Sequence, residues 1–232
     1  GVAKVGGIIG FARDRSGDVT LKNVINEARV EATGSTDANA AGLVGCATDD
    51  TKIFATNCAN TGEVRGQDGQ CAAFIGWAQR GTTFTNCWNI GDIYNMQDNN
   101  SLYRGDGVSV SNCYDANGNE SYRQGTKIAR STVASGELCF KLNGDQSSIV
   151  WYQTLGTDAD VHPVPFSTGG HSQVYATGDV KCDGTLLGNN TFTNDASESA
   201  TLSHSNANGW CTVCDKLDAN YLKADDEGFY SI

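Results

Sequence analysis

The sequence predicts an all-β protein: a parallel β-solenoid (β-helix) of about four coils, closed by a short helix/strand cap and followed by a small β-rich module that contains cysteines. One observation behind this prediction is a near-duplication, because residues 57–64 read NCANTGEV and residues 86–93 read NCWNIGDI. Copies spaced by roughly 20–50 residues are typical of solenoids, propellers and arrays. A second observation is that no copy contains a ten-residue segment with 3.6-residue periodicity, which argues against helical repeats.

Each copy begins with a block of small and apolar residues and continues with an Asn-containing unit. The blocks are GGIIG at 6–10, AGLVG at 41–45 and AAFIG at 72–76. The Asn units are NVIN at 23–26, NCAN at 57–60, NCWN at 86–89 and, without a recognisable block before it, NCYD at 112–115. The apolar runs are short and bounded by Gly, Asn, Asp and Thr, so they predict strands separated by turns.

Stacked copies would place equivalent residues about 4.8 Å apart, the spacing of paired strands. Cys58, Cys87 and Cys113 would then form an inward ladder, with Val24 at the same level in the first copy. We expect free thiols there rather than bridges between coils, because a buried cysteine behaves as a small hydrophobe. A second ladder is expected at a bend, with side chains that bond to the backbone of the next coil: Asn23, Asn57, Asn86 and Asn112.

The AGLVG block followed by NCxNxG resembles the GLUG repeat of bacterial cell-surface proteins of the Bacteroidota type, over about residues 4–118. The resemblance implies an extracellular, mostly parallel β-solenoid within a large cell-surface or secreted protein. The segment ASGELCFKLNG at 134–144, with WYQTLGTD at 151–158, is similar to the element that closes such arrays. DDEGFYSI at 225–232 resembles the opening of a further module, so the chain is expected to be a fragment of a larger multi-module protein.

We therefore predict four parts. Residues 1–118 form the solenoid, and residues 119–168 form a capping segment with a helix over 133–142 and a strand around 151–155. Residues 169–224 form a small β-rich module with a candidate zinc site, and residues 225–232 begin the following module.

The charge balance limits the partners. The chain has 27 acidic and 16 basic side chains, for a formal net charge of −11. This balance disfavours nucleic acids and anionic membrane surfaces, because both are bound through Lys and Arg. No apolar run approaches the roughly 18 residues that span a bilayer, so no membrane span is expected. An extracellular or cell-surface location is expected, with a protein or glycan as the ligand, and we attribute the missing targeting segment to a cut or processed chain.

The cysteines of the C-terminal part suggest a metal site. Cys211 and Cys214 form a CxxC pair, a frequent half of a zinc site, and His204 and Cys182 would complete four ligands. His171 is a candidate substitute ligand. The alternatives are a Cys211–Cys214 or Cys182–Cys214 disulfide, or reduced thiols. The expected cofactor is thus structural zinc or none.

No catalytic constellation is recognisable. GxSxG, HExxH, P-loop and GxGxxG motifs are absent from the sequence. Seven acidic residues are candidates for a polysaccharide-active enzyme, yet they fall mostly in expected loops, where they are typical turn formers: Asp14, Asp18, Asp49, Asp50, Asp92, Asp98 and Asp106. We therefore expect no enzyme and no catalytic residues.

Aromatic residues that vary between copies are candidate contacts. Trp77 follows its block where Phe11 and Cys46 stand in the other copies, and Trp88 and Tyr114 share one position of the Asn unit. An outward Trp88/Tyr114 stripe would offer a stacking platform, whereas the alternative is a side face covered by loops. The leading hypothesis is a non-catalytic adhesin-like protein or structural stalk. The alternatives are a filament-forming protein that assembles end to end, and a carbohydrate-binding or carbohydrate-active β-solenoid.

Overall fold

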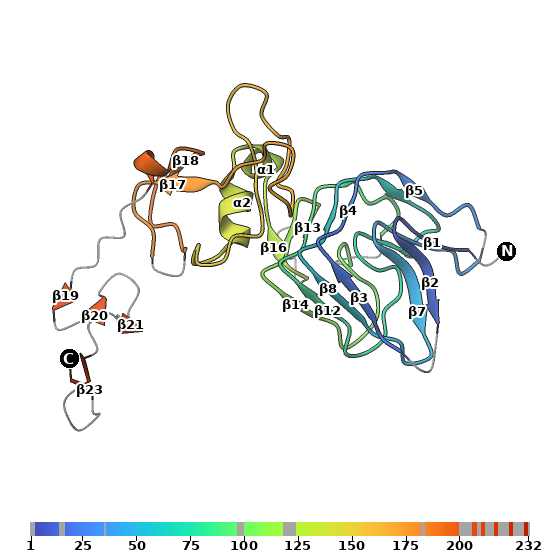
Figure 1. The fold of residues 1–232 in the computed structure, drawn as a ribbon. Coiled ribbons are helices and arrows are strands. Elements are labelled where there is room, and N and C mark those ends of the chain that lie inside the picture. The colour runs from blue at the N-terminus through green and yellow to red at the C-terminus, as the bar shows by residue number, and fades with distance from the viewer. Residues whose placement is uncertain are drawn as a thin grey trace. The chain divides into compact units, whose positions relative to one another are not determined.

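The computed structural model describes residues 3–13, 17–34, 36–96, 100–117, 124–181 and 184–199, and beyond residue 200 only the backbone of five short strands. The fold is strand-rich with few helices and has parallel sheets, which confirms the all-β class (Figure 1). The chain divides into two compact units. The repeat unit contains Gly1–Thr132 and Val164–Phe166, and the C-terminal unit contains Val133–Pro163 and Ser167–Ile232.

In the repeat unit, successive copies place their strands in the same sheets, and every pairing is parallel. Two sheets carry the Gly blocks: β1 (Lys4–Gly6), β6 (Asn39–Ala41) and β11 (Cys71–Ala72), and β2 (Ile9–Arg13) with β7 (Val44–Thr48). A third sheet consists of β3 (Val19–Lys22), β8 (Ile53–Thr56), β12 (Thr83–Thr85) and β14 (Ser109–Ser111). A fourth consists of β4 (Ile25–Asn26), β9 (Ala59–Asn60), β13 (Trp88–Asn89), β15 (Tyr114–Asp115) and β16 (Thr126–Lys127), and the last pairs β5 (Val30–Glu31) with β10 (Val64–Arg65).

The register of these sheets follows the repeats of the sequence. Ala59 pairs with Ile25 on one side and with Trp88 on the other, and Trp88 in turn pairs with Tyr114. Isolated bridges such as Val44 with Ile75 continue the same alignment where strands are shorter. Residues at one position of the motif therefore lie next to one another in neighbouring copies.

Alternation along the strands creates the core of the repeat unit. In β8, Ile53 and Ala55 are buried, while Phe54 and Thr56 are less so. Phe74 and Phe84 meet inside with ring centroids 5.1 Å apart. Glycine is required where copies come close, because a Cβ on Gly91 would lie 2.0 Å from the carbonyl oxygen of Gly62.

The C-terminal unit contains short elements. The predicted helix over 133–142 is split into α1 (Arg130–Ala134), which begins in the repeat unit, and α2 (Glu137–Leu142). The split falls at Gly136, whose φ of 89° is outside the helical region. Of the predicted strand around 151–155, the structure shows only a single β-bridge residue, Tyr152. Asn143 instead holds this segment, accepting from Trp151 N at 2.9 Å and donating to Trp151 O at 2.9 Å.

The remaining elements are antiparallel strands and one 3-10 turn. β17 (Tyr175–Thr177) pairs with β18 (Thr191–Thr193), and η1 (Ala196–Glu198) follows. The backbone strands after residue 200 are β19 (Asn206–Ala207), β20 (Trp210–Cys211), β21 (Lys216–Leu217), β22 (Lys223–Ala224) and β23 (Tyr230–Ser231). No helix within the described residues is long and apolar enough to cross a membrane.

Candidate binding groove

A row of thiols runs through the interior of the repeat unit. Cys58, Cys87 and Cys113 are buried and free, and Val24 packs at the edge of the same core, so the predicted inward ladder is confirmed. The backbone N–H of Cys58 donates to Sγ of Cys87 at 3.4 Å. Burial raises the pKa of the Cys87 thiol, which keeps it protonated and unreactive at neutral pH.

The Asn residues that open each unit form the second predicted row, but their bonding differs from the prediction. All four have a left-handed backbone, with φ of 57°, 55°, 52° and 48° from Asn23 to Asn112. Asn57 Nδ2 donates to Asn23 Oδ1 at 3.0 Å, and Asn112 Nδ2 donates to Asn86 Oδ1 at 2.8 Å. The amides thus bond one another in two pairs across neighbouring copies, a contact that the prediction did not include. Asparagine fits this bend because its short side chain tolerates positive φ.

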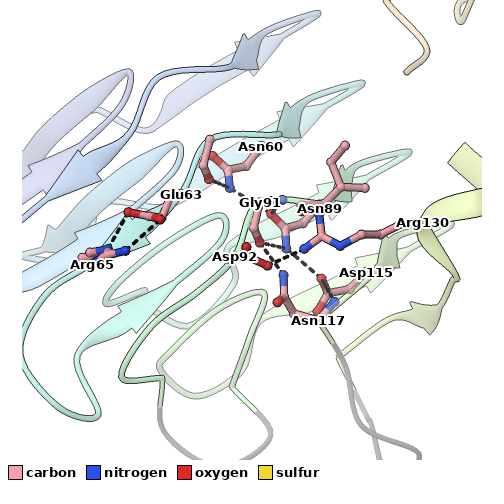
Figure 2. Close-up of polar contacts among 11 residues, drawn as sticks. Asn60, Glu63, Arg65, Asn89, Gly91, Asp92, Asp115, Asn117 and Arg130 are labelled. Carbon is pink, nitrogen blue, oxygen red and sulfur yellow. Dashed lines mark hydrogen bonds and ion pairs between the residues drawn. The ribbon is translucent and has the colours of Figure 1, made fainter. Parts of the chain in front are cut away.

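A further row, which the sequence reasoning missed, is continuous and buried (Figure 2). Asn26 Nδ2 donates to Asn60 Oδ1 at 2.8 Å, and Asn60 Nδ2 donates to Asn89 Oδ1 at 2.8 Å. Asn89 Nδ2 then donates to Asp115 Oδ1 at 2.7 Å. The fully buried Asp115 also accepts from Ser101 Oγ and, at 3.0 Å, from Asn117 N. Each bond in this row points the same way, and the row ends on a carboxylate.

The exposed side of the repeat unit near this row is charged. Arg130 donates to Ile90 O at 2.6 Å and to the Asp92 carboxylate (Figure 2). Glu63 accepts from Arg65 Nε at 2.5 Å, and this hydrogen bond holds the pKa of Glu63 below its usual value. Exposed pairs of this kind add little to stability, because solvent screens them.

A groove of about 800 Å³ opens beside the two sheets that carry the Gly blocks. Its volume falls within the roughly 300–1,000 Å³ typical of small-ligand sites. Two rows of equivalent positions line it, and in each row the residue differs from copy to copy. One row is Lys4, Asn39 and Gln70, and the other is Phe11, Cys46 and Trp77.

Polar contacts link the first row from copy to copy. Lys4 Nζ donates to Asn39 Oδ1, and Asn39 Nδ2 donates to Gln70 Oε1 at 3.1 Å. Arg104 Nη1 also donates to Gln70 Oε1, at 2.9 Å, and to Gly76 O at 2.8 Å. Arg104 thereby joins the row although it belongs to no recognisable block. No repeated motif marks these residues, which is why sequence reasoning did not select them.

The groove contains three cations and two carboxylates, in contrast to the acidic chain as a whole. Lys4 Nζ lies 2.8 Å from Asp37 Oδ2, and Arg13 Nε lies 2.6 Å from Asp49 Oδ2. The Arg104 guanidinium lies over the Trp77 ring, with Cζ 5.4 Å from the centroid. Burial lowers the pKa of Arg104, but not enough to discharge a guanidinium near neutral pH.

The predicted metal ligands are not brought together by the described structure. Cys182, His204 and Cys214 lie outside the described residues, and only the backbone of Cys211 is described, in β20. No group of three or more potential ligands occurs among the side chains that the structure describes. The zinc site therefore stays a prediction.

His171, the substitute ligand, contacts a carboxylate instead. Its Nδ1 lies 2.8 Å from Asp160 Oδ2, which also accepts from Thr154 N at 2.5 Å. Burial opposes ionisation of Asp160, yet these hydrogen bonds and the charge of His171 outweigh it and lower the pKa of Asp160. The Asp160–His171 pair thus joins the two segments of the C-terminal unit, Val133–Pro163 and Ser167–Ile232.

The candidate acidic residues do not gather in the groove. Asp14 and Asp98 lie outside the described residues, and of the other five only Asp49 lines the groove. The outward Trp88/Tyr114 stripe is also wrong. Trp88 is fully buried, so the alternative of a covered side face is correct for it, and Tyr114 is half-buried with its hydroxyl donating to Asn112 Oδ1 at 2.8 Å.

No family model matches the chain, and neither does any curated protein or solved structure. What the groove binds is therefore inferred from its own side chains.

Proposed function

We propose that the protein is a non-catalytic repeat protein of the cell surface or the secreted space, adhesin-like or a structural stalk. Its repeat unit would be a parallel β-solenoid of about four coils of the GLUG type, which presents a ligand groove on one side. The observation that carries this proposal is the difference between rows. Interior rows keep one residue type in three of their four members, whereas the groove rows change residue at every copy.

The carboxylates of the groove support a binding role over a catalytic one. Asp37 is paired with Lys4, and Asp49 is paired with Arg13. Glycoside hydrolysis commonly needs two facing carboxyl groups, one of them held protonated. In the groove, each of these carboxylates is instead held in an ion pair with a cation of its own.

A single incubation tests the proposal. The chain is mixed with a panel of soluble polysaccharides, and retention in affinity electrophoresis is measured together with the release of new reducing ends. We expect retention without release. Reducing ends that disappear in Asp37→Asn and Asp49→Asn would show an enzyme instead. Antibody labelling of intact cells that make the protein tests the location, and labelling only after permeabilisation would contradict it.

A filament is the second candidate, and one observation favours it. The strands of the first copy, β1 to β5, are each paired along one edge only in the part of the chain that the structure describes. Unpaired parallel edges are templates for further strands. Sedimentation at increasing protein concentration tests this candidate: end-to-end assembly gives a rising sedimentation coefficient, whereas a constant value excludes it.

A further inference from the structure

Arg104 is a buried cation that forms no ion pair with a carboxylate among the described residues. It is 7% exposed, lines the groove, and lies within ion-pair distance of no described carboxylate, unlike Lys4 and Arg13. Its Nη1 is saturated by Gln70 and Gly76, but its Nε is buried and finds no acceptor among the described atoms. The Asp37 carboxylate attracts this charge only at longer range, so the charge of Arg104 is partly compensated, and an anion in the groove would stabilise it further.

The groove also offers two aromatic faces. Phe11 is 45% exposed and Trp77 is 43% exposed, although both are large hydrophobic residues. They belong to the first and third copies, two strand spacings apart, which is about 10 Å. Gln70, which is partly exposed, also lines the groove, and the N–H groups of its side-chain amide can donate to hydroxyl groups.

We propose that the groove binds an acidic oligosaccharide, with a uronic-acid carboxylate at the Arg104 and Arg13 guanidinium groups and a sugar ring on Trp77. Guanidinium and carboxylate match in a planar, bidentate way, and a sugar ring presents a C–H face to an aromatic ring. Densely charged polyanions fit less well, because the chain as a whole has a net charge of −11 and repels them. The inference rests on the proposed function, whose binding site it assigns to a class of ligand.

Matched variants make the test sharp. Trp77→Ala is compared with Tyr94→Ala, because Tyr94 is also 43% exposed and also carries a guanidinium, that of Arg65 at 4.3 Å, but does not line the groove. Arg13→Ala is compared with Arg29→Ala, another exposed arginine paired with a carboxylate. Arg104→Lys keeps the charge and loses the bidentate geometry, and its fold is checked by circular dichroism.

The experiment is calorimetric titration of the intact chain with trigalacturonate, with a neutral galactan trisaccharide and with a hexaglutamate peptide. We expect trigalacturonate to bind, and to bind at least ~10-fold more tightly than either other probe. Trp77→Ala and Arg13→Ala should each weaken binding by ~5–10-fold, the loss typical of a contact worth more than 1 kcal/mol. Their controls should bind as the native chain does, and added salt should weaken the interaction.

Equal binding of the acidic and neutral trisaccharides would overturn the proposal, as would tighter binding of hexaglutamate. Native affinity in both Trp77→Ala and Arg13→Ala would overturn the location, even if Arg104→Lys failed to fold. None of these results touches the non-catalytic function. That function fails separately, if trigalacturonate is cleaved during the titration and new reducing ends appear.

Discussion

The interior of the repeat unit and its groove face are built on the same register but use it in opposite ways. The interior row Asn26, Asn60 and Asn89 repeats one side chain, so each amide is both donor and acceptor for its neighbours. Positions of the groove face, such as that shared by Phe11 and Trp77, change from copy to copy. Repetition in register satisfies buried polar groups, and variation in register creates a surface that distinguishes ligands. Changes in the interior should therefore alter stability, and changes in the groove should alter binding.

The largest expected effect is on the rate at which the buried thiols are alkylated. The six described cysteines are buried, so alkylation in the native state must wait for unfolding and should be at least ~1,000-fold slower than in denaturant.

The other three of the nine cysteines are Cys182, Cys211 and Cys214. If they bind zinc as predicted, a chelator should expose them to the reagent and native mass spectrometry should show the loss of one ion. No mass change after chelation would contradict the zinc prediction.

The next effect is on the buried amide row. Asn89→Ala removes one of the two acceptors of Asn60 Nδ2 and one of the donors to Asp115, which should lower the free energy of unfolding by roughly 3–5 kcal/mol. Asn112→Ala is the control, because it removes one exposed bond to Asn86 and should cost less than about 1 kcal/mol. Urea denaturation measures both. Equal costs would mean that burial of the row is not what stabilises the unit.

A smaller effect is expected at the end of this row. Asp115→Asn keeps an oxygen that can accept from Asn89 and Asn117, and loses the strength of charge-assisted bonds. We expect a loss of about 1 kcal/mol, clearly less than for Asn89→Ala. A loss as large as that of Asn89→Ala in the same denaturation experiment would show that the charge itself holds the row.

The smallest effect on stability belongs to the groove. Trp77→Ala and Arg13→Ala change exposed side chains and should shift the free energy of unfolding by no more than about 0.5–1 kcal/mol while weakening ligand binding. Thermal unfolding of the same samples used for titration checks this. A large drop in Tm would assign the aromatic to the fold rather than to recognition.

The interior rows of the repeat unit could be predicted from the sequence better than the residues of the groove, for a physical reason. A residue that recurs at one position of a repeat is expected to lie next to its copies. The row of Cys58, Cys87 and Cys113 could therefore be predicted from spacing alone. The second Asn of the motif repeats as well and becomes Asp115 in the last copy, a visible signal of the buried row that was not used. By contrast, the contact of Arg104 with Gln70 joins residues that share no motif.

Three further differences between the predictions and the structure concern local geometry, which the spacing of residues does not determine. The position of Trp88 in the motif indicated a face opposite to the thiols, but not whether that face is covered. The row that begins at Asn23 was placed correctly, whereas its hydrogen-bond acceptors depended on a left-handed backbone that the sequence only suggests. Gly136 was likewise overlooked as an interruption of a helix.

The one-way bonding of the buried amide row has a consequence for how such a protein can grow. Every amide in the row donates a hydrogen bond to the next member in the direction of Asp115, and an ionised carboxylate has no N–H or O–H group to donate. The strand paired next to it has the exposed Lys127 at the matching position, which is not an amide. A further copy on the Asn26 side could therefore continue the one-way bonding, whereas an amide beyond Asp115 would have to donate back to the carboxylate. One oxygen in place of an amide nitrogen thus gives the row of hydrogen bonds a direction and a last member.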